Sequence, residues 1–485
     1  MSILTIAASP RSVPKLQKSG RTSSSTTFRC PSSLRFPVAT FIRIEGKLSS
    51  LTRSELERLL IDTARSAFGP ILPPNALAAD KATVYQRPSP SFELRAHPAA
   101  EPVEIDLRNP DFESGPRFSV YAHTGTVGIG YHHAIIRWID ALGSAGVLWD
   151  PAGEEAGDSN GQPVGRDVRA LARKPELNMA KRLQECLETM NVTGMGFSLC
   201  LPVPLAGMER STVDLRLSMG VRSLDWLRAA AGDPDRARNV LAWPDPGLSP
   251  AVIRDAAICG MWLDVPWCRP CDMRTAELYG YILSLLALAH QQDPSLEMPW
   301  DEWLELALLA GAANSMPQST RRTSHPSRSG QLSTVGPIGY RRDPQCNRLP
   351  NGVQLQLPGS MLFIEHDGNK DWFIATDGPR AVRINSQPHA MPLSKEQQRA
   401  MIFTPPTPAA ATGGPEHYRT VDTACRFGAA YKWTEPLPGC SGLSGDVTVI
   451  QARFADASSL GTLIFVCDEG TPIDWVDTAM ESVWL

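Results

Sequence analysis

Apolar residues recur at helical spacing through much of the first two thirds of the chain. In LTRSELERLLIDTARSAFG, Thr52 and Glu55 have the spacing of a capping box, apolar residues then recur every three or four positions, and Gly69 predicts the helix end. The same spacing predicts helices at residues 132–142, 181–189, 223–231, 249–262, 272–291 and 300–311. The last two are joined through Asp293-Pro294, which suggests an antiparallel helical hairpin.

Alternation of apolar and polar residues instead predicts β-strands, which dominate the last quarter of the chain. Isolated strands are expected at residues 103–107, 118–121 and 196–203. Beyond residue 348, strands are expected at 353–357, 361–365, 372–376, 381–384, 447–454 and 462–467, with helices near 394–402 and 473–484. The sequence therefore predicts an α+β protein of several domains: a mixed, mainly helical N-terminal region and a C-terminal α+β domain with a mostly antiparallel sheet.

Composition divides the chain into four predicted parts. These are a basic, Ser-rich disordered tail (1–48), a mixed, mainly helical domain (49–310), a basic polar linker (311–348) and an α+β domain (349–485). The first 44 residues contain seven Lys and Arg and no Asp or Glu. This composition is typical of organellar transit peptides, so an organellar location is the alternative to the cytoplasmic one expected for the rest.

Bulk composition limits the classes of function. At 485 residues the chain is too long for one ordinary core, and its 42% hydrophobic and 20% charged residues are typical of a soluble globular protein. A net charge of −4 lacks the basic excess of a nucleic-acid-binding protein. No apolar run reaches the length of about 18 residues that a membrane-spanning helix requires. We therefore expect neither a nucleic-acid partner nor a membrane span.

The stretch PWCRPCDM, residues 266–273, contains Cys268 and Cys271 at the spacing of a redox motif. WCRPC resembles the WCGPC motif of thioredoxins at four of five positions, and a predicted helix begins just after it. In thioredoxins a helix N-terminus lowers the pKa of the first thiol, and the second thiol resolves the mixed disulfide. That fold also needs a β-strand leading into the pair, whereas residues 249–262 have helical spacing. A thiol–disulfide oxidoreductase with Cys268 and Cys271 as catalytic residues is therefore an alternative hypothesis.

The glycine-rich stretch TGTVGIG, residues 124–130, lies between a predicted strand and a predicted helix. A possible second strand, GVLWD, ends about twenty residues later, which completes the outline of a dinucleotide-binding site. The stretch is similar to the TGxxxGxG motif of short-chain dehydrogenases, but it is one residue shorter, and the chain has no Tyr-x-x-x-Lys pair. A glycine-rich bend is the competing interpretation. As a second alternative, a nucleotide-binding oxidoreductase would use as cofactor-binding residues Gly125, Gly128, Gly130 and Asp150.

Tryptophan is unusually frequent, with twelve residues against eight tyrosines. The sequence PWDEW places Trp300 and Trp303 one helical turn apart on the same face of a predicted helix. These rings either fill the core between helices or form an aromatic surface for a protein partner. A zinc site is not expected, because neither Cys259 nor His290 has a partner at ligand spacing beside the cysteine pair.

No catalytic constellation is complete in the sequence. We therefore expect a non-enzymatic protein with an interaction or accessory role, although enzymatic activity stays open. The expected partner is another protein, with Trp300 and Trp303 as interaction residues, and neither a cofactor nor a metal is expected.

Overall fold

The computed structural model describes most of the chain from residue 41 onward. The described residues are 41–48, 52–79, 91–108, 117–157, 175–193, 197–198, 215–312, 337–349, 352–364, 372–389, 391–406, 414–422, 427–436, 446–456 and 458–483. The greater part of the predicted tail and of the predicted linker lies outside these ranges.

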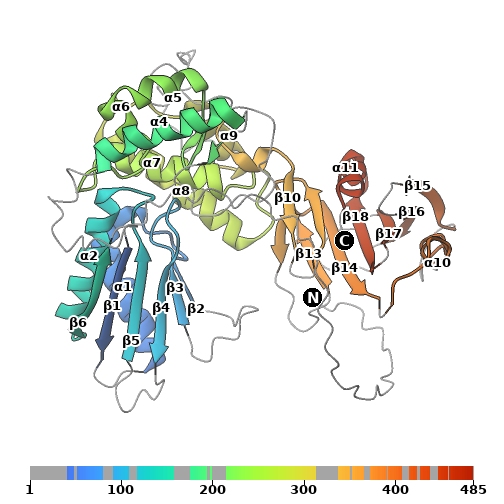
Figure 1. Cartoon of the computed structure of the whole chain (residues 1–485), viewed down its shortest axis with the longest axis horizontal. Coiled ribbons are helices and arrows are strands. Elements are labelled where there is room, and N and C mark those ends of the chain that lie inside the picture. Colours follow the sequence, from blue (N-terminus) through green and yellow to red (C-terminus); the bar gives the residue numbers. More distant parts are fainter. Residues whose placement is uncertain are drawn as a thin grey trace.

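The N-terminal part is built on a six-stranded antiparallel sheet with the strand order β2-β3-β4-β5-β1-β6. Its strands are β1 (Phe41–Lys47), β2 (Leu77–Ala79), β3 (Ser91–Leu94), β4 (Val103–Arg108), β5 (Arg117–His123) and β6 (Leu148–Gly157). Two helices, α1 (Arg53–Phe68) and α2 (Ile129–Ser144), lie side by side next to this sheet (Figure 1). The indole Nε1 of Trp138 on α2 donates a hydrogen bond to the carbonyl oxygen of Leu60 on α1 at 3.3 Å.

Helix α1 begins and ends where local sequence signals place it. The backbone N–H of Thr52 donates to the Glu55 carboxylate at 2.7 Å, and the N–H of Glu55 donates to the Thr52 hydroxyl at 3.3 Å. Gly69 terminates the helix with a φ of 58°, a conformation in which glycine carries no steric penalty. The predicted capping box and helix end are both confirmed.

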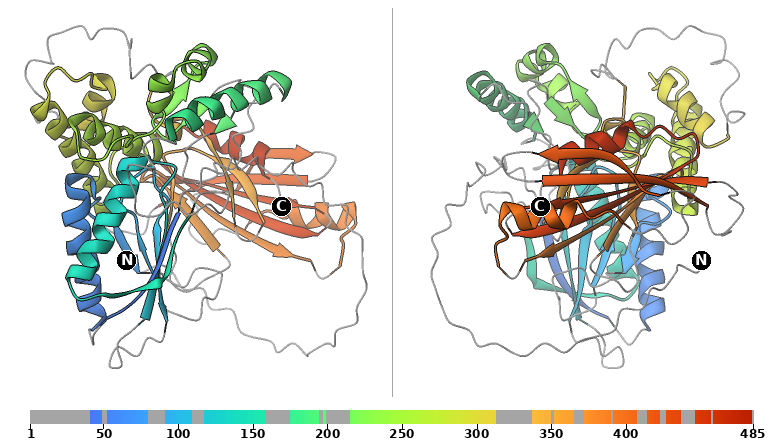
Figure 2. Two further views of the ribbon diagram at one scale, coloured as in Figure 1. Left: turned by 60° about the vertical axis from the view of Figure 1, so that its left-hand side comes forward. Right: turned by 90° about the vertical axis from the view of Figure 1, so that its right-hand side faces the viewer.

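The helices that follow form a layer above the edge of the six-stranded sheet (Figures 1 and 2). They are α4 (Pro175–Thr193), α5 (Leu224–Ala231), α6 (Pro234–Arg238), α7 (Pro250–Leu263), α8 (Met273–Gln292) and α9 (Trp300–Leu309). A small sheet between α4 and α5 consists of β7 (Phe197–Ser198), β8 (Leu215–Leu217) and β9 (Gly220–Arg222). Helices α7, α8 and α9 share one hydrophobic core with α1, α2 and the six-stranded sheet, whereas α4, α5 and α6 enclose a smaller separate core.

The C-terminal part is a seven-stranded antiparallel sheet with the strand order β12-β13-β14-β18-β17-β16-β15. Its strands are β12 (Leu362–Ile364), β13 (Trp372–Thr376), β14 (Arg380–Pro388), β15 (Glu416–Asp422), β16 (Phe427–Pro436), β17 (Asp446–Ala455) and β18 (Ser459–Asp468). One face packs against α11 (Asp474–Ser482) and the hairpin of β10 (Gln345–Arg348) and β11 (Gln354–Leu357). Helix α10 (Lys395–Ile402) covers one end of the opposite face. The predicted α+β class is confirmed.

Two stretches outside the predicted domains belong to ordered elements. Strand β1 lies within the range 1–48 that the sequence analysis assigned to the tail, and it pairs with both β5 and β6. Its alternating residues Ile42 and Ile44 are buried in the core, which is why the strand forms despite the basic composition around it. The 3₁₀ turn Tyr340–Arg342 and strand β10 lie within the range 311–348, so the ordered chain resumes before residue 349.

Candidate functional site

The two cysteines of the redox-like motif lie in the loop between α7 and α8. Helix α7 leads into the pair, as its helical spacing predicts, and α8 begins at Met273, after both cysteines. The carboxylate of Asp272 caps α8 by accepting a hydrogen bond from the N–H of Thr275 at 2.7 Å. The helix N-terminus is therefore complemented by a carboxylate rather than by a thiolate.

Electrostatics around the pair favours protonated thiols. Burial, with a smaller contribution from Asp377, raises the pKa of Cys268 to about 11. Burial and the neighbouring Asp272 carboxylate raise the pKa of Cys271 as well. A thiol nucleophile needs a lowered pKa at neutral pH, so these surroundings do not activate either sulfur. The catalytic role of Cys268 and Cys271 stays a prediction without support from their environment.

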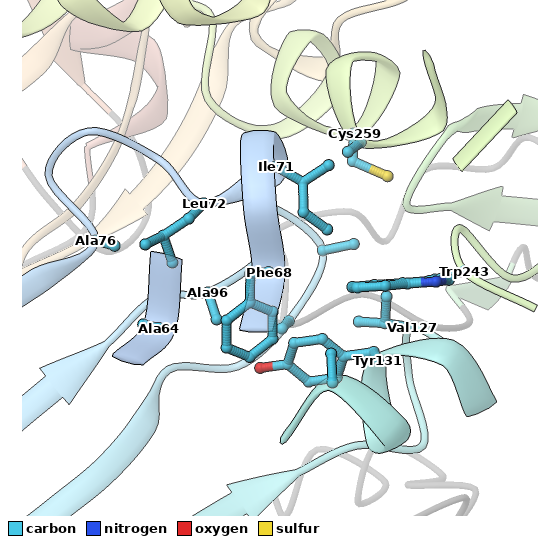
Figure 3. Close-up of a cluster of buried hydrophobic side chains, with 14 of the residues drawn as sticks. Ala64, Phe68, Ile71, Leu72, Ala76, Ala96, Val127, Tyr131, Trp243 and Cys259 are labelled. Atoms are coloured by element: carbon cyan, nitrogen blue, oxygen red, sulfur yellow. The ribbon is translucent and has the colours of Figure 1, made fainter. Parts of the chain in front are cut away.

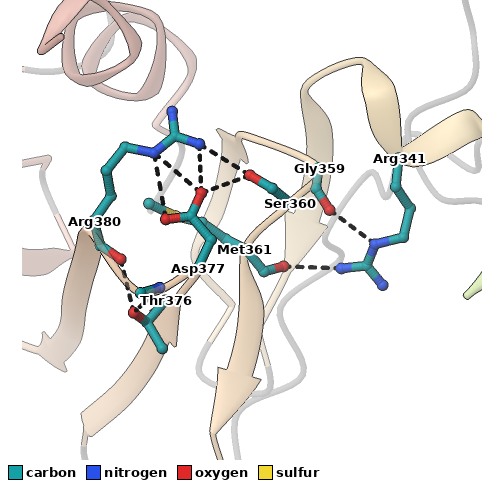
Figure 4. Close-up of polar contacts among 8 residues, drawn as sticks. Arg341, Gly359, Ser360, Met361, Thr376, Asp377 and Arg380 are labelled. Atoms are coloured by element: carbon teal, nitrogen blue, oxygen red, sulfur yellow. Dashed lines mark hydrogen bonds and ion pairs between the residues drawn. The ribbon is translucent and has the colours of Figure 1, made fainter. Parts of the chain in front are cut away.

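The loop that carries the cysteines forms a joint with the C-terminal sheet. A Cβ placed on Gly378, in the turn between β13 and β14, would lie 3.3 Å from Cβ of Cys271. Figure 4 shows the polar contacts beside this turn. The buried carboxylate of Asp377 accepts hydrogen bonds from the Ser360 hydroxyl at 2.6 Å and from Nε of Arg380 at 3.0 Å. Arg341 donates to the carbonyl oxygens of Gly359 and Met361, each at 2.8 Å.

Residues 338–342 hold the other side of this joint. The N–H of Ile338 donates to the Glu302 carboxylate of α9 at 3.0 Å, and Arg342 forms two hydrogen bonds, of 2.8 and 2.6 Å, to Glu305. The Arg342 guanidinium also lies 3.6 Å from the ring centroid of Trp267, whose φ of 53° is unusual for a residue other than glycine. Through these contacts the CxxC loop joins the N-terminal part of the chain to the C-terminal sheet, which is a structural role.

The glycine-rich stretch between β5 and α2 is occupied by the backbone around Trp243. The N–H of Gly130 donates to the Trp243 carbonyl at 3.1 Å, and the Trp243 N–H donates to the Val127 carbonyl at 2.8 Å. A Cβ on Gly128 would lie 2.2 Å from the Trp243 carbonyl oxygen, and one on Gly130 would lie 2.1 Å from the Trp243 ring. Figure 3 shows Trp243 beside Val127 and Tyr131 in this core. The close backbone approach that requires glycine here is made by the chain itself.

Asp150 is not placed next to the glycine-rich stretch. The sequence analysis put it at a strand end, but β6 continues from Leu148 to Gly157 because it pairs along β1. Asp150 and Ser119 both pair with Glu45 of β1, so they lie at the same level of the sheet. The glycine-rich stretch begins after His123, at the end of β5. Four residues of strand separate these levels by about 13 Å. The structure therefore does not bring Asp150 next to Gly125, Gly128 and Gly130, and the cofactor-binding role of these four residues stays a prediction without support from their arrangement.

The two tryptophans of the PWDEW stretch differ in burial. Trp303 is 1% exposed and belongs to the main core, whereas Trp300 is half-buried. Their rings stack at a centroid distance of 5.2 Å with an interplanar angle of 6°, and His290 meets Trp300 edge-on at 5.2 Å. Trp303 thus fills the core, and the direct interaction role predicted for the pair rests on Trp300.

Helix α9 has an apolar stripe that the sequence analysis did not identify. Leu304 and Leu308 follow Trp300 at intervals of four residues and are 41% and 60% exposed. The intervals place the three side chains on one side of the helix, away from the buried Leu306, with the Trp303 ring at the border of this side where it stacks on Trp300. The sequence signal for this stripe is the i, i+4, i+8 spacing of its three apolar residues.

The surroundings of the α9 stripe are acidic. From residue 275 to residue 320 the sequence contains no Lys or Arg. The acidic residues in this range are Glu277, Asp293, Glu297, Asp301, Glu302 and Glu305. Glu302 is buried and Glu305 pairs with Arg342, whereas Asp301 is exposed one residue along from the stripe. The segment that carries the stripe is therefore acidic in sequence, and Asp301 is exposed beside the stripe on α9.

The described residues contain no group of three or more His, Cys, Asp or Glu side chains arranged to hold a metal ion. Within the same part of the chain, every helix is too short or too polar to cross a membrane.

Comparisons with known proteins do not assign this chain to a family. No family model matches it, and no curated protein matches it either. Among solved structures, a crystal structure from Bacteroides thetaiotaomicron VPI-5482 is similar to 29% of this chain, with 10% sequence identity and a TM-score of 0.22. The match covers 47% of that chain, about half its length, and such a low score does not define a shared fold.

Proposed function

We propose that this protein is a non-enzymatic binding protein whose partner is another protein, and that α9 carries the binding surface. The observation behind this proposal is the apolar stripe formed by Trp300, Leu304 and Leu308. Two exposed leucines next to a half-buried tryptophan are the kind of side chains that anchor protein interfaces. Helix α9 is anchored in the core by Trp303 and Leu306, so the stripe is presented on a rigid element.

Charge indicates the chemistry of the partner. The hairpin of α8 and α9 carries acidic residues and, after Arg274, no Lys or Arg. A second copy of α9 would bring Asp301 near acidic residues of its own kind, which is unfavourable. An amphipathic partner helix with an apolar face and Lys or Arg at its border satisfies both the stripe and the acidic surroundings.

A peptide titration tests this proposal with a defined probe. The probe is a fluorescent helical peptide of leucine and lysine with all leucines on one face, and its control carries glutamate in place of lysine. The full chain is compared with Leu308→Asp and with the matched control Leu148→Asp, because Leu148 is 71% exposed on β6. We expect binding of the lysine peptide to weaken about tenfold or more in Leu308→Asp, from the lost burial of one leucine, and to stay unchanged in Leu148→Asp.

The added negative charge makes the result decisive. A purely electrostatic contact with the lysine peptide would become stronger in Leu308→Asp. Equal binding by the wild type and Leu308→Asp, or equal binding of the glutamate peptide, would contradict the proposal.

A further inference from the structure

A buried arginine lies where the hairpin of β8 and β9 meets α7. Arg222, the last residue of β9, is only 1% exposed. Its Nε and Nη1 atoms are buried and have no hydrogen-bond partner among the described residues, and no ion pair is formed by its guanidinium in that part of the chain. Buried arginines are normally paired, because removing a guanidinium from water without replacement bonds is costly.

None of the described groups around Arg222 accepts a hydrogen bond from its Nε or Nη1 atom. Asp255 on α7 contributes a favourable charge, but its carboxylate is engaged by Arg254, with Nε at 2.8 Å and Nη2 at 2.7 Å. The Nη1 atom of Arg254 donates to the carbonyl oxygen of Glu297 at 3.0 Å. The Trp226 ring centroid lies 5.4 Å from Cζ of Arg222, which gives a cation–π contact but accepts no N–H in the plane of the guanidinium.

The charges around Arg222 come from Arg254, Asp255 and, more weakly, Glu297. Arg222 and Arg254 contribute two positive charges, Asp255 contributes one negative charge, and Glu297 adds a weaker favourable effect on Arg222. Burial lowers the pKa of Arg222 to about 10, so the side chain is still charged at neutral pH. Among the described residues, the cluster therefore holds a charged guanidinium whose Nε and Nη1 atoms have no acceptor.

We propose that Arg222 is the core of a binding site for a small oxyanion, which supplies the acceptor oxygens that its guanidinium lacks. A carboxylate or an inorganic phosphate has the required negative charge and compact oxygen acceptors. This site is separate from the stripe on α9, and its test does not depend on the proposed protein partner.

Thermal unfolding of the full chain, in a buffer whose anion is bulky, tests the site. Sodium phosphate and sodium acetate are titrated separately at constant ionic strength into the wild type and Arg222→Met, in which an apolar side chain of similar length replaces the guanidinium. We expect one of the two anions to raise the Tm of the wild type saturably, by about 3 °C at roughly 100 times its Kd, and to leave Arg222→Met unchanged. The anion that raises the Tm shows whether the site takes a phosphate or a carboxylate.

The anion-free state gives a second readout. Without added anion we expect Arg222→Met to have a Tm equal to or above that of the wild type, because the substitution removes an unpaired buried charge. Arg254→Met, which removes a buried arginine paired with Asp255 and Glu297, should lower Tm in every buffer. Equal anion shifts in the wild type and Arg222→Met would show an adventitious ion only, and they would overturn the proposal. A low Tm of Arg222→Met in all buffers would also overturn it, by showing that the chain itself satisfies the guanidinium.

Discussion

Substituting Gly128 by alanine tests the contact between the glycine-rich stretch and Trp243. Gly128 has a φ of 126° and a ψ of 176°, a region that residues with a Cβ rarely occupy, which costs about 1–3 kcal/mol. The new Cβ would also lie 2.2 Å from the carbonyl oxygen and 2.7 Å from the carbonyl carbon of Trp243. Relief of this clash requires the two backbone hydrogen bonds at Gly130 and Val127 to lengthen or break, at about 1 kcal/mol each.

The matched control is Gly146→Ala. Gly146 has a φ of 105°, but nothing lies within 4 Å of the position of its Cβ. Both variants carry backbone strain, and only Gly128→Ala also carries the clash. We expect urea unfolding to show a loss of stability about 2 kcal/mol larger for Gly128→Ala than for Gly146→Ala.

Equal losses in the two variants would refute the placement of Trp243 against the stretch. A Tm increase of the wild type with NAD(P)H that Gly128→Val removes would instead support the nucleotide-binding hypothesis.

Three further predictions follow from burial and charge. Because the pKa of Cys268 is about 11, its alkylation at pH 7.5 should be on the order of 100-fold slower than in the unfolded chain, and comparable rates by mass spectrometry would contradict this. Burial lowers the pKa of His97 to about 3 and of His132 to about 4, so between pH 6.5 and about 4 the unfolded chain binds these protons more fully than the folded chain. The free energy of unfolding should therefore fall on acidification from pH 6.5 to 4 by up to about 1.4 kcal/mol per pH unit for each histidine, and His97→Gln should remove its share. Asp377→Asn should cost about 2–3 kcal/mol in urea unfolding, because Asp377 is 2% exposed and pairs with an arginine, whereas the exposed Asp422→Asn should cost below about 0.5 kcal/mol.

Local signals in the sequence predicted local structure. The capping box of Thr52 and Glu55 fixes the start of α1, because both hydrogen bonds join residues three positions apart. Helical spacing likewise predicted α7, α8 and α9 to within two residues at each end. In each case the information lies within a few turns of the chain.

Contacts between distant residues could not be predicted in the same way. The fit of the Gly128 backbone against Trp243 joins positions more than a hundred residues apart, so the glycines resembled a ligand loop. The continuation of β6 past Asp150 depends on pairing with β1, a strand that the basic composition of its surroundings concealed. A glycine or an aspartate in a motif does not reveal whether its neighbour is a ligand or the chain itself.

The candidate site was predicted in part. The sequence pointed to Trp300 and Trp303. Which of the two rings is buried in the core and which is half-buried depends on how α9 packs on α8. Leu304 and Leu308 could have been predicted from their spacing. Their exposure could not, because an apolar residue on a helix is buried or exposed according to the elements that pack around it.

Site-specific photo-cross-linking tests most directly whether the α9 stripe is a protein-binding surface. Benzoylphenylalanine replaces Leu308 in one copy of the chain and the exposed Leu148 of β6 in another, and each is irradiated in its native cells. We expect position 308 alone to form a discrete covalent adduct, with the cross-linked fragment of the partner carrying apolar residues bordered by Lys or Arg. No adduct at position 308, or the same adducts at both positions, would contradict the account.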